Sequence, residues 1–162
     1  AGTDTNGCGR STGANACKTI RYGCGQAQQQ LDKQQRPLEV LVAPTVVYKN
    51  ECSETGIEMT TTATNMSIRV LPGLGSKQVE VDCGGEGKFL NVSQPAAPGA
   101  DADAGGSRFL LEGIYLHDGH SRLSGGVFVD GGSVTIRDCI FARLMSGGMS
   151  SSESARSSCL QV

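Results

Sequence analysis

The chain has 162 residues, of which 23 are glycine and seven are cysteine, and its formal net charge is −2. This small charge argues against nucleic acid or an anionic membrane surface as the partner, and no run of about 20 apolar residues predicts a membrane-spanning helix. Aromatic residues make up only 4% of the chain and tryptophan is absent. A core built on large aromatic side chains is therefore not expected, and the many glycines favour a narrow stack of short strands and turns.

The first 36 residues differ in composition from the remainder of the chain. Residues 1–36 hold three of the seven cysteines and the run QAQQQLDKQQ. Apolar residues at helical spacing predict a short amphipathic helix, namely Ala16, Ile20, Ala27 and Leu31. Gly23 and Gly25 are expected to interrupt this helix, and Pro37 is expected to end it. The alternative interpretation is a disordered, Gln-rich leader held by a disulfide.

Short apolar runs separated by Pro and Gly turns follow in residues 37–145 and predict β-strands. They lie at 38–44, 56–62, 66–72, 77–83, 88–93, 108–118, 125–131 and 133–144. Residues 94–107, QPAAPGADADAGGS, are predicted to form a loop inserted between strands. Residues 146–162 are rich in Ser and Gly and predict either a tail or the start of a further coil, so we expect the chain to be a fragment of a longer protein.

Two of the predicted strand ranges, 108–118 and 133–144, repeat one another. RFLLEGIYLHDG at 108–119 aligns with SVTIRDCIFARL at 133–144 when Leu111 is set on Ile136. In both copies the alternation of apolar residues slips by one place, at Gly113 and at Asp138. We interpret the slip as a bend between two consecutive strands. Residues 77–85, KQVEVDCGG, are expected to be a third copy, with Val79 and Val81 on Val134 and Ile136, if one residue is dropped. Such self-similarity predicts stacked repeats, one coil being about 25 residues and three strands.

The cysteines predict disulfides in an oxidising compartment. They are Cys8, Cys17, Cys24, Cys52, Cys83, Cys139 and Cys159. No CxxC pair occurs, so zinc bound by cysteine is not expected. The odd count requires at least one thiol that is free or bonded outside the chain. Two N-glycosylation sequons, at Asn65 and Asn91, favour the same compartment. We therefore expect an extracellular or cell-surface protein.

The order of these motifs resembles the pectin-lyase-like superfamily of right-handed parallel β-helices. The segments CGRSTGANACKTIRYGCGQA, LEVLVAPTVVY, VEVDCGG and GGVFVDGGSVTIRDCIF carry the likeness, which is greatest to the repeats of polymorphic outer membrane proteins and their eukaryotic cell-surface relatives. The resemblance implies an all-β, right-handed parallel β-helix with three strands per coil and an N-terminal Cys-rich cap. It also implies that Val134, Ile136, Cys139 and Phe141 point inward. VAPTVVY lacks the glycine that the family has in this turn.

Some members of the superfamily are polysaccharide lyases or glycoside hydrolases, so catalysis is the alternative function. LHDGHSR at 116–122 is the compact cluster of ionisable residues in the sequence, with Asp118, His120 and Arg122. Asp118 and Asp138, one coil apart, are the candidate acid–base pair for glycoside hydrolysis. The cluster lacks the Gly-His-Gly and Arg-x-Lys motifs that the resemblance implies for polygalacturonases. DADAGG at 101–106 has too few oxygen ligands for calcium, and we expect no metal or cofactor.

The sequence thus favours a non-catalytic extracellular module with a structural or adhesive role. Its expected partners are other copies, other cell-surface proteins or glycans, without nucleic acid, in a surface or filament assembly. The alternative is a carbohydrate-active enzyme that acts on an acidic polysaccharide. A groove lined by acids and arginines would favour the enzyme, whereas a flat face of Thr, Ser and Gly would favour the structural module.

Overall fold

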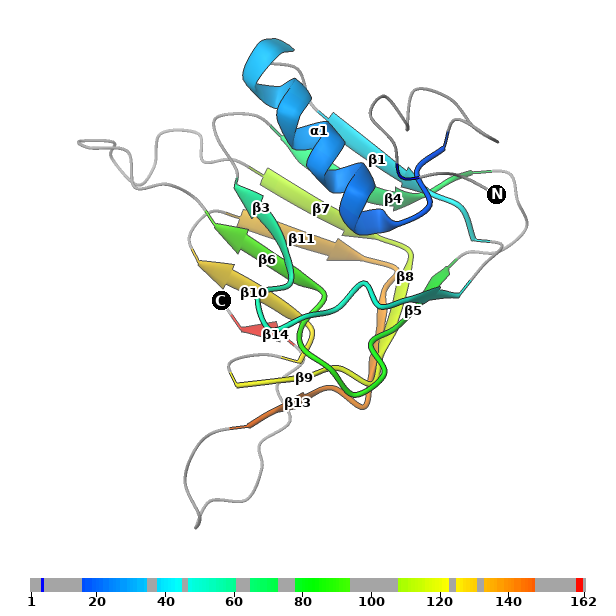
Figure 1. Ribbon diagram of the computed structural model, residues 1–162, viewed down its shortest axis with the longest axis vertical. Helices are drawn as coiled ribbons and strands as arrows, with labels where there is room; N and C mark the ends of the chain where they lie inside the picture. Colours follow the sequence, from blue (N-terminus) through cyan, green and yellow to red (C-terminus); the bar gives the residue numbers. More distant parts are fainter. Residues whose placement is uncertain are drawn as a thin grey trace, which may run out of the picture.

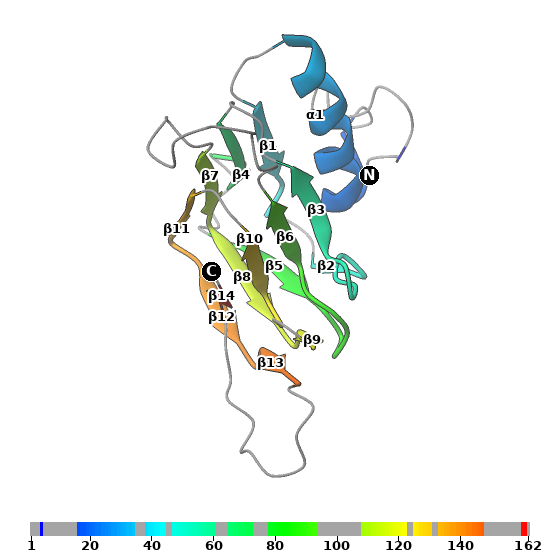
Figure 2. The same cartoon turned by 90° about the vertical axis from the view of Figure 1, so that its left-hand side faces the viewer.

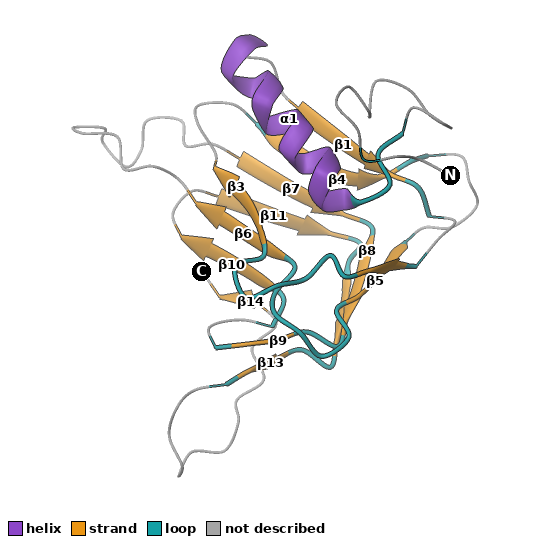
Figure 3. Cartoon of the chain, viewed as in Figure 1, coloured by secondary structure: helices purple, strands orange, loops and turns teal. Residues whose placement is uncertain are grey.

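The computed structural model describes residues 4, 16–34, 38–44, 47–60, 65–72, 78–93, 108–122, 125–130, 133–147 and 160–161. They contain one helix and short strands in the order α1 (Ile20–Gln34), β1 (Leu38–Val42), β2 (Tyr48–Lys49), β3 (Ile57–Thr60), β4 (Met66–Val70), β5 (Val79–Asp82), β6 (Leu90–Ser93), β7 (Arg108–Glu112), β8 (Ile114–His117), β9 (His120–Ser121), β10 (Val127–Asp130), β11 (Ser133–Arg137), β12 (Ile140–Ala142), β13 (Met145–Ser146) and β14 (Leu160–Gln161). The all-β class expected from the sequence is confirmed (Figure 3).

All paired strands in these sheets run parallel. The first sheet has the order β1-β4-β7-β11, the second β2-β5-β8-β12 and the third β3-β6-β10-β14, while β9 and β13 form a two-stranded ribbon. The chain visits the three large sheets in rotation, and each new strand lies beside the strand of the preceding circuit. Figures 1 and 2 show the sheets arranged around a common interior. A parallel connection needs a crossover, which here is made by the strands of the other two sheets.

Each of the two aligned segments contains a bend at the position where its alternation of apolar residues slips. Ile136 pairs with Leu111 and Ile140 with Tyr115, which confirms the alignment of the two segments. Gly113 and Asp138 break the strands and have φ values of 73° and 52°. A left-handed residue turns the chain sharply, so β7 leads directly into β8 and β11 into β12.

The placement of the third copy was wrong. Val79 pairs with Ile114 rather than lying in the sheet of Val134, so VEVD belongs to the second sheet. No residue has to be dropped, because VEVD aligns with IYLH without a gap. The circuits are also unequal in length, since the step from Leu38 to its partner Met66 is longer than the step from Leu111 to Ile136. The expected coil length of about 25 residues therefore holds between β7 and β11 and between β8 and β12, whereas the step from Val127 on β10 to Leu160 on β14 is longer.

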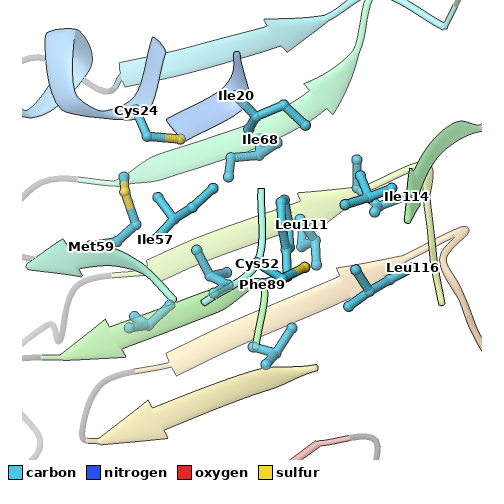
Figure 4. Packing of buried hydrophobic residues seen from close by; sticks show 14 of the residues in the cluster. Ile20, Cys24, Cys52, Ile57, Met59, Ile68, Phe89, Leu111, Ile114 and Leu116 are labelled. Atoms are coloured by element: carbon cyan, nitrogen blue, oxygen red, sulfur yellow. The ribbon is translucent and has the colours of Figure 1, made fainter. Parts of the chain in front are cut away.

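Side chains that point inward form ladders across successive circuits. Ile68 and Leu111 are adjacent in the first sheet, Ile114 in the second, and none is exposed to solvent. Figure 4 shows such residues from the sheets and from α1 meeting in one core. At about 25 cal/mol per Å² of buried apolar surface, these ladders are the main stabilising contribution. The inward positions of the last circuit are only partly buried, namely Val134, Ile136, Cys139 and Phe141.

Helix α1 packs against β1 and β3, the first strands of their sheets (Figure 1). It buries Ile20 and Cys24 in the core, as the helical spacing predicts for Ile20. The predicted interruption was wrong, because the helix continues through Gly23 and Gly25. A Cβ at Gly23 would lie 3.6 Å from a methyl carbon of Val40. This is an ordinary van der Waals distance, and a Cβ at Gly25 would meet nothing within 4 Å, so close packing requires neither glycine. The cost of each helical glycine, about 1 kcal/mol, is offset by the burial of Ile20 and Cys24 in the core.

Each predicted strand range contains a strand, and two of the ranges contain two strands separated by a bend. Four very short strands, β2, β9, β13 and β14, were not predicted, because they carry too few alternating positions to give a pattern in the sequence. The predicted loop at 94–107 and most of the segment 146–162 lie outside the described residues. Among the described helices, none is long and apolar enough to cross a membrane.

Candidate functional site

The outward face of the second sheet carries a cluster of charged side chains around His117. β5 and β8 alternate, so Val79 and Val81 point into the core while Glu80 and Asp82 point outward. The register places Asp82 directly opposite His117. Asp118 follows immediately, at the end of β8. Two adjacent circuits therefore bring together residues that are far apart in the sequence.

His117 lies between carboxylates although it is on an outward-facing position. Its Nδ1 is 2.8 Å from an Asp118 oxygen and 3.9 Å from an Asp82 oxygen, and its Nε2 is 3.1 Å from a Glu80 oxygen. The Tyr115 ring packs beside it, with ring centroids 4.9 Å apart. The residue is only 6% exposed. The imidazole is thus held in a fixed orientation by polar contacts on both of its nitrogens.

Arg143, from the next circuit, completes the cluster. Its guanidinium forms a two-point contact with Asp118, at 2.5 and 2.7 Å, and Nη2 lies 3.4 Å from His117 Nδ1. Asp118 and Arg143 both have left-handed backbones, with φ of 55° and 51°. Non-glycine residues in this region are uncommon and concentrate at turns and functional sites. One strained corner thus presents a carboxylate and a guanidinium side by side.

The charges in the cluster shift the pKa values of its members. Burial opposes protonation of His117, but the hydrogen bonds with Asp118 and Glu80, together with the charges of Asp82 and Asp118, outweigh it and raise its pKa. The contacts with Arg143 and then His117 hold the pKa of Asp118 well below its usual range. Asp118 therefore stays ionised at neutral pH and is poorly suited to act as a general acid.

Asp118 belongs to this cluster, but it does not meet the other candidate catalytic residues. Asp138 occupies the bend before β12, opposite Gly113, whereas Asp118 lies opposite Arg143 at the other end of these strands. His120 is exposed on β9 and Arg122 is exposed just after it. The partners of Asp118 are instead His117 and Arg143. The geometry thus does not bring Asp118 and Asp138 together as an acid–base pair.

The residues that sequence reasoning missed are Glu80, Asp82, His117 and Arg143. The signal was the ungapped alignment of VEVDCGG with IYLHDGH, which sets Asp82 on His117. The alternative alignment, on the strand that contains Val134, concealed it. Asp82, His117 and Asp118 each offer one ligand atom, and these atoms lie within 4.8 Å of one another.

A second charged row lies on the outward face of the first sheet. Arg69 contacts Glu39 at 2.8 Å and also contacts Glu112, and Arg137 lies 3.5 Å from Glu112. Opposite charges therefore alternate across four neighbouring strands. A hollow in this face is lined by residues that include Glu39, Asn65, Arg108 and Arg137.

The cysteines divide into bonded and free residues. Cys52 and Cys83, 31 residues apart, form a disulfide that ties the first circuit to the second, and Cys17 is also disulfide-bonded. Among the described residues, Cys24 and Cys139 carry free thiols. Cys8 and Cys159 lie outside the described residues. Disulfides are typical of an oxidising compartment.

The two predicted glycosylation positions differ in accessibility. Asn65 is exposed immediately before β4. Asn91 lies within β6, between Glu58 and Phe128 of the neighbouring strands, and its side-chain oxygen is buried. The surroundings of Asn65 suit a bulky glycan better, and modification at both positions stays a prediction.

Comparison of the chain with protein-family models, curated proteins and solved structures finds no match.

Proposed function

We propose that the chain is a right-handed parallel β-helix that serves as a structural or adhesive module outside the cell. The observation that carries this proposal is the rotation of the chain through three parallel sheets with residues stacked in register. Such a stack presents long, regular outer faces to a partner. The Cys52–Cys83 disulfide supports an extracellular location.

The outward charges on the first sheet are consistent with a structural role. Arg69 on β4 contacts both Glu39 on β1 and Glu112 on β7. Paired charges of opposite sign across neighbouring strands favour the observed register. In this proposal the face is a rigid surface for other copies, cell-surface proteins or glycans, and the chain is part of a larger surface or filament assembly.

A carbohydrate-active enzyme is the second candidate function. The hollow on the first sheet is lined by one acid and two arginines, Glu39, Arg108 and Arg137. A surface lined by acids and arginines favours an enzyme over a flat structural face. Arginines there suit the carboxylates of an acidic polysaccharide.

Incubation with polygalacturonate, a polymer of uronic acid, distinguishes the two functions. The structural proposal expects retention on the immobilised polymer without new reducing ends or the absorbance of unsaturated uronate. Arg108→Ser should reduce retention if the hollow is the contact surface, whereas Arg122→Ser is the matched control at an exposed arginine. Release of shortened oligosaccharides by wild-type protein would overturn the structural proposal in favour of the enzyme.

The location is tested by intact mass after secretion from a eukaryotic host. We expect extra mass that a glycosidase removes, with Asn65 as the occupied position, and a mass increase on reduction and alkylation that accounts for the disulfides. A secreted chain without glycan and with all cysteines reduced would contradict the extracellular proposal.

A further inference from the structure

We propose that Asp82, His117 and Asp118 bind a divalent transition-metal ion, with Zn²⁺ as the representative probe. The proposal goes beyond the structural role and does not depend on it. It rests on three features of the cluster: the spacing of the donor atoms, the carboxylates on both sides of the imidazole, and the position of Arg143.

The donor spacing suits a metal ion. Two ligands of a tetrahedral zinc ion, each about 2.0–2.1 Å from the metal, are about 3.4 Å apart. His117 Nδ1 is 2.8 Å from the Asp118 oxygen and 3.9 Å from the Asp82 oxygen. Changes of about half an ångström would bring both distances to this value, and the Asp82 and Asp118 ligand atoms, which lie within 4.8 Å of each other, would close around the same ion. Three protein ligands leave a fourth position for water or for a ligand group of a partner.

The surroundings of the imidazole call for a positive charge at Nδ1. Carboxylates are acceptors only, and a neutral imidazole has a single N–H. His117 faces Asp118 at Nδ1 and Glu80 at Nε2, both within hydrogen-bond distance. With Nε2–H donated to Glu80, either a second proton or a metal ion at Nδ1 matches the Asp118 carboxylate on that side. A metal ion that takes the place of this proton has the Nδ1 lone pair and the carboxylate oxygens as ligands.

Glu80 lies where a carboxylate would accept the second ring N–H of a metal-bound histidine. A ligating histidine commonly donates its other ring N–H to a carboxylate, which fixes the ring and increases its basicity. Glu80 lies 3.1 Å from His117 Nε2 on the side away from Asp82 and Asp118. The histidine is thus already oriented with Nδ1 toward the two aspartates.

Arg143 competes with the ion for Asp118. Its guanidinium supplies positive charge to the cluster, with one nitrogen 3.4 Å from His117 Nδ1. The side chain is 65% exposed, so it is able to swing into solvent when an ion binds. One imidazole with two carboxylates favours zinc or a similar transition metal over Ca²⁺, which takes six to eight oxygen ligands.

The test is a calorimetric titration of the full-length, disulfide-intact protein with ZnCl₂ at pH 7.5. We expect saturable binding of one ion that His117→Asn weakens at least about 10-fold and Glu80→Gln weakens by about 10-fold. Arg143→Gln should tighten binding, because a competing cation is removed. His120→Asn and Cys139→Ser are matched controls that should leave the affinity unchanged.

A measurement on the wild-type protein tests the proposal even if the variants do not fold. In the NMR spectrum of the imidazole nitrogens, Zn²⁺ should shift Nδ1 of His117 and leave His120 unchanged. The absence of saturable binding, an unshifted His117, or equal affinity in wild type and His117→Asn would each overturn the proposal. Weaker binding in Arg143→Gln would contradict the role of Arg143 as a competitor.

Discussion

The two ends of the strand stack differ in how well their inward side chains are covered. At the first circuit, α1 covers β1 and β3 and buries Ile20 and Cys24. At the last circuit, β11 and β12 have inward residues that are only partly buried. The same ladders therefore contribute unequally along the stack, because burial rather than residue type determines how much an apolar side chain stabilises the fold.

The largest difference between the two ends is expected in thiol chemistry. Burial raises the pKa of Cys24 to about 12. Burial also raises the pKa of Cys139, but Cys139 is less buried than Cys24. At pH 8 only about 1 in 10,000 Cys24 thiols is then ionised. We expect iodoacetamide to label Cys139 at least about 100-fold faster than Cys24, measured by peptide mass spectrometry over time.

Labelling in denaturant provides the control, because both thiols should then react at similar rates. Equal rates in the native protein would mean that α1 opens readily and does not protect the first circuit.

The next difference concerns the ladder that runs through the first sheet. Leu111 and Ile136 are neighbours across β7 and β11, but Leu111 is fully buried and Ile136 is only partly buried. Leu111→Ala should reduce the free energy of unfolding by about 2–5 kcal/mol. Ile136→Ala should reduce it by only about 1 kcal/mol, because its methyl groups already meet solvent.

Urea denaturation followed by circular dichroism measures both variants under the same conditions. If Ile136→Ala is as damaging as Leu111→Ala, the last circuit is covered in solution, for instance by another copy.

The attachment of α1 gives a third and smaller expected effect. The buried carboxylate of Glu51 accepts hydrogen bonds from the backbone N–H groups of Ile20 and Arg21, both at 2.9 Å. These are N–H groups of the first helical turn, which no residue within the helix accepts. Glu51→Ala should therefore lower the free energy of unfolding by about 1–3 kcal/mol. Glu86→Ala, at an exposed acid in a turn, is the control.

The Glu51 contact should also depend on pH. Burial raises the pKa of Glu51 above 4.5, although the two backbone hydrogen bonds oppose this. A carboxyl that binds its proton more tightly in the folded state stabilises the fold most below pH 4.5 and less as pH rises through the raised pKa. The stability difference between wild type and Glu51→Ala should therefore grow as pH falls, and a difference that shrinks would contradict this.

The sequence predicted the local features of the fold better than the contacts between circuits. The slipped alternation identified the bends at Gly113 and Asp138, because a change of phase is visible within a few residues. It did not show which strands lie side by side, since VEVD aligns with more than one later segment. That choice decides whether Asp82 meets His117, so the cluster was missed although each residue was visible. Helix α1 likewise continues through two glycines because the burial of Ile20 and Cys24 in the core outweighs the low helix propensity of glycine, and this burial depends on tertiary structure.

The smallest expected effect compares the same bend in two successive circuits. Gly113 is buried with φ of 73°, whereas Asp138 is exposed with φ of 52°. A Cβ in this region is strained by about 1–2 kcal/mol, less for Asp than for most residues. Gly113→Ala should therefore destabilise the protein by about 1 kcal/mol or more, while Asp138→Gly should change its stability by less than about 0.5 kcal/mol.

Thermal unfolding of the two variants at one concentration measures this pair. Asp138→Gly relieves backbone strain but also gives the unfolded chain more freedom, so the two contributions oppose each other. A large loss of stability in Asp138→Gly would show that the aspartate side chain, and not only the left-handed backbone, holds the last corner. The exposed end of the stack would then be specified by side-chain contacts as strongly as the helix-covered end.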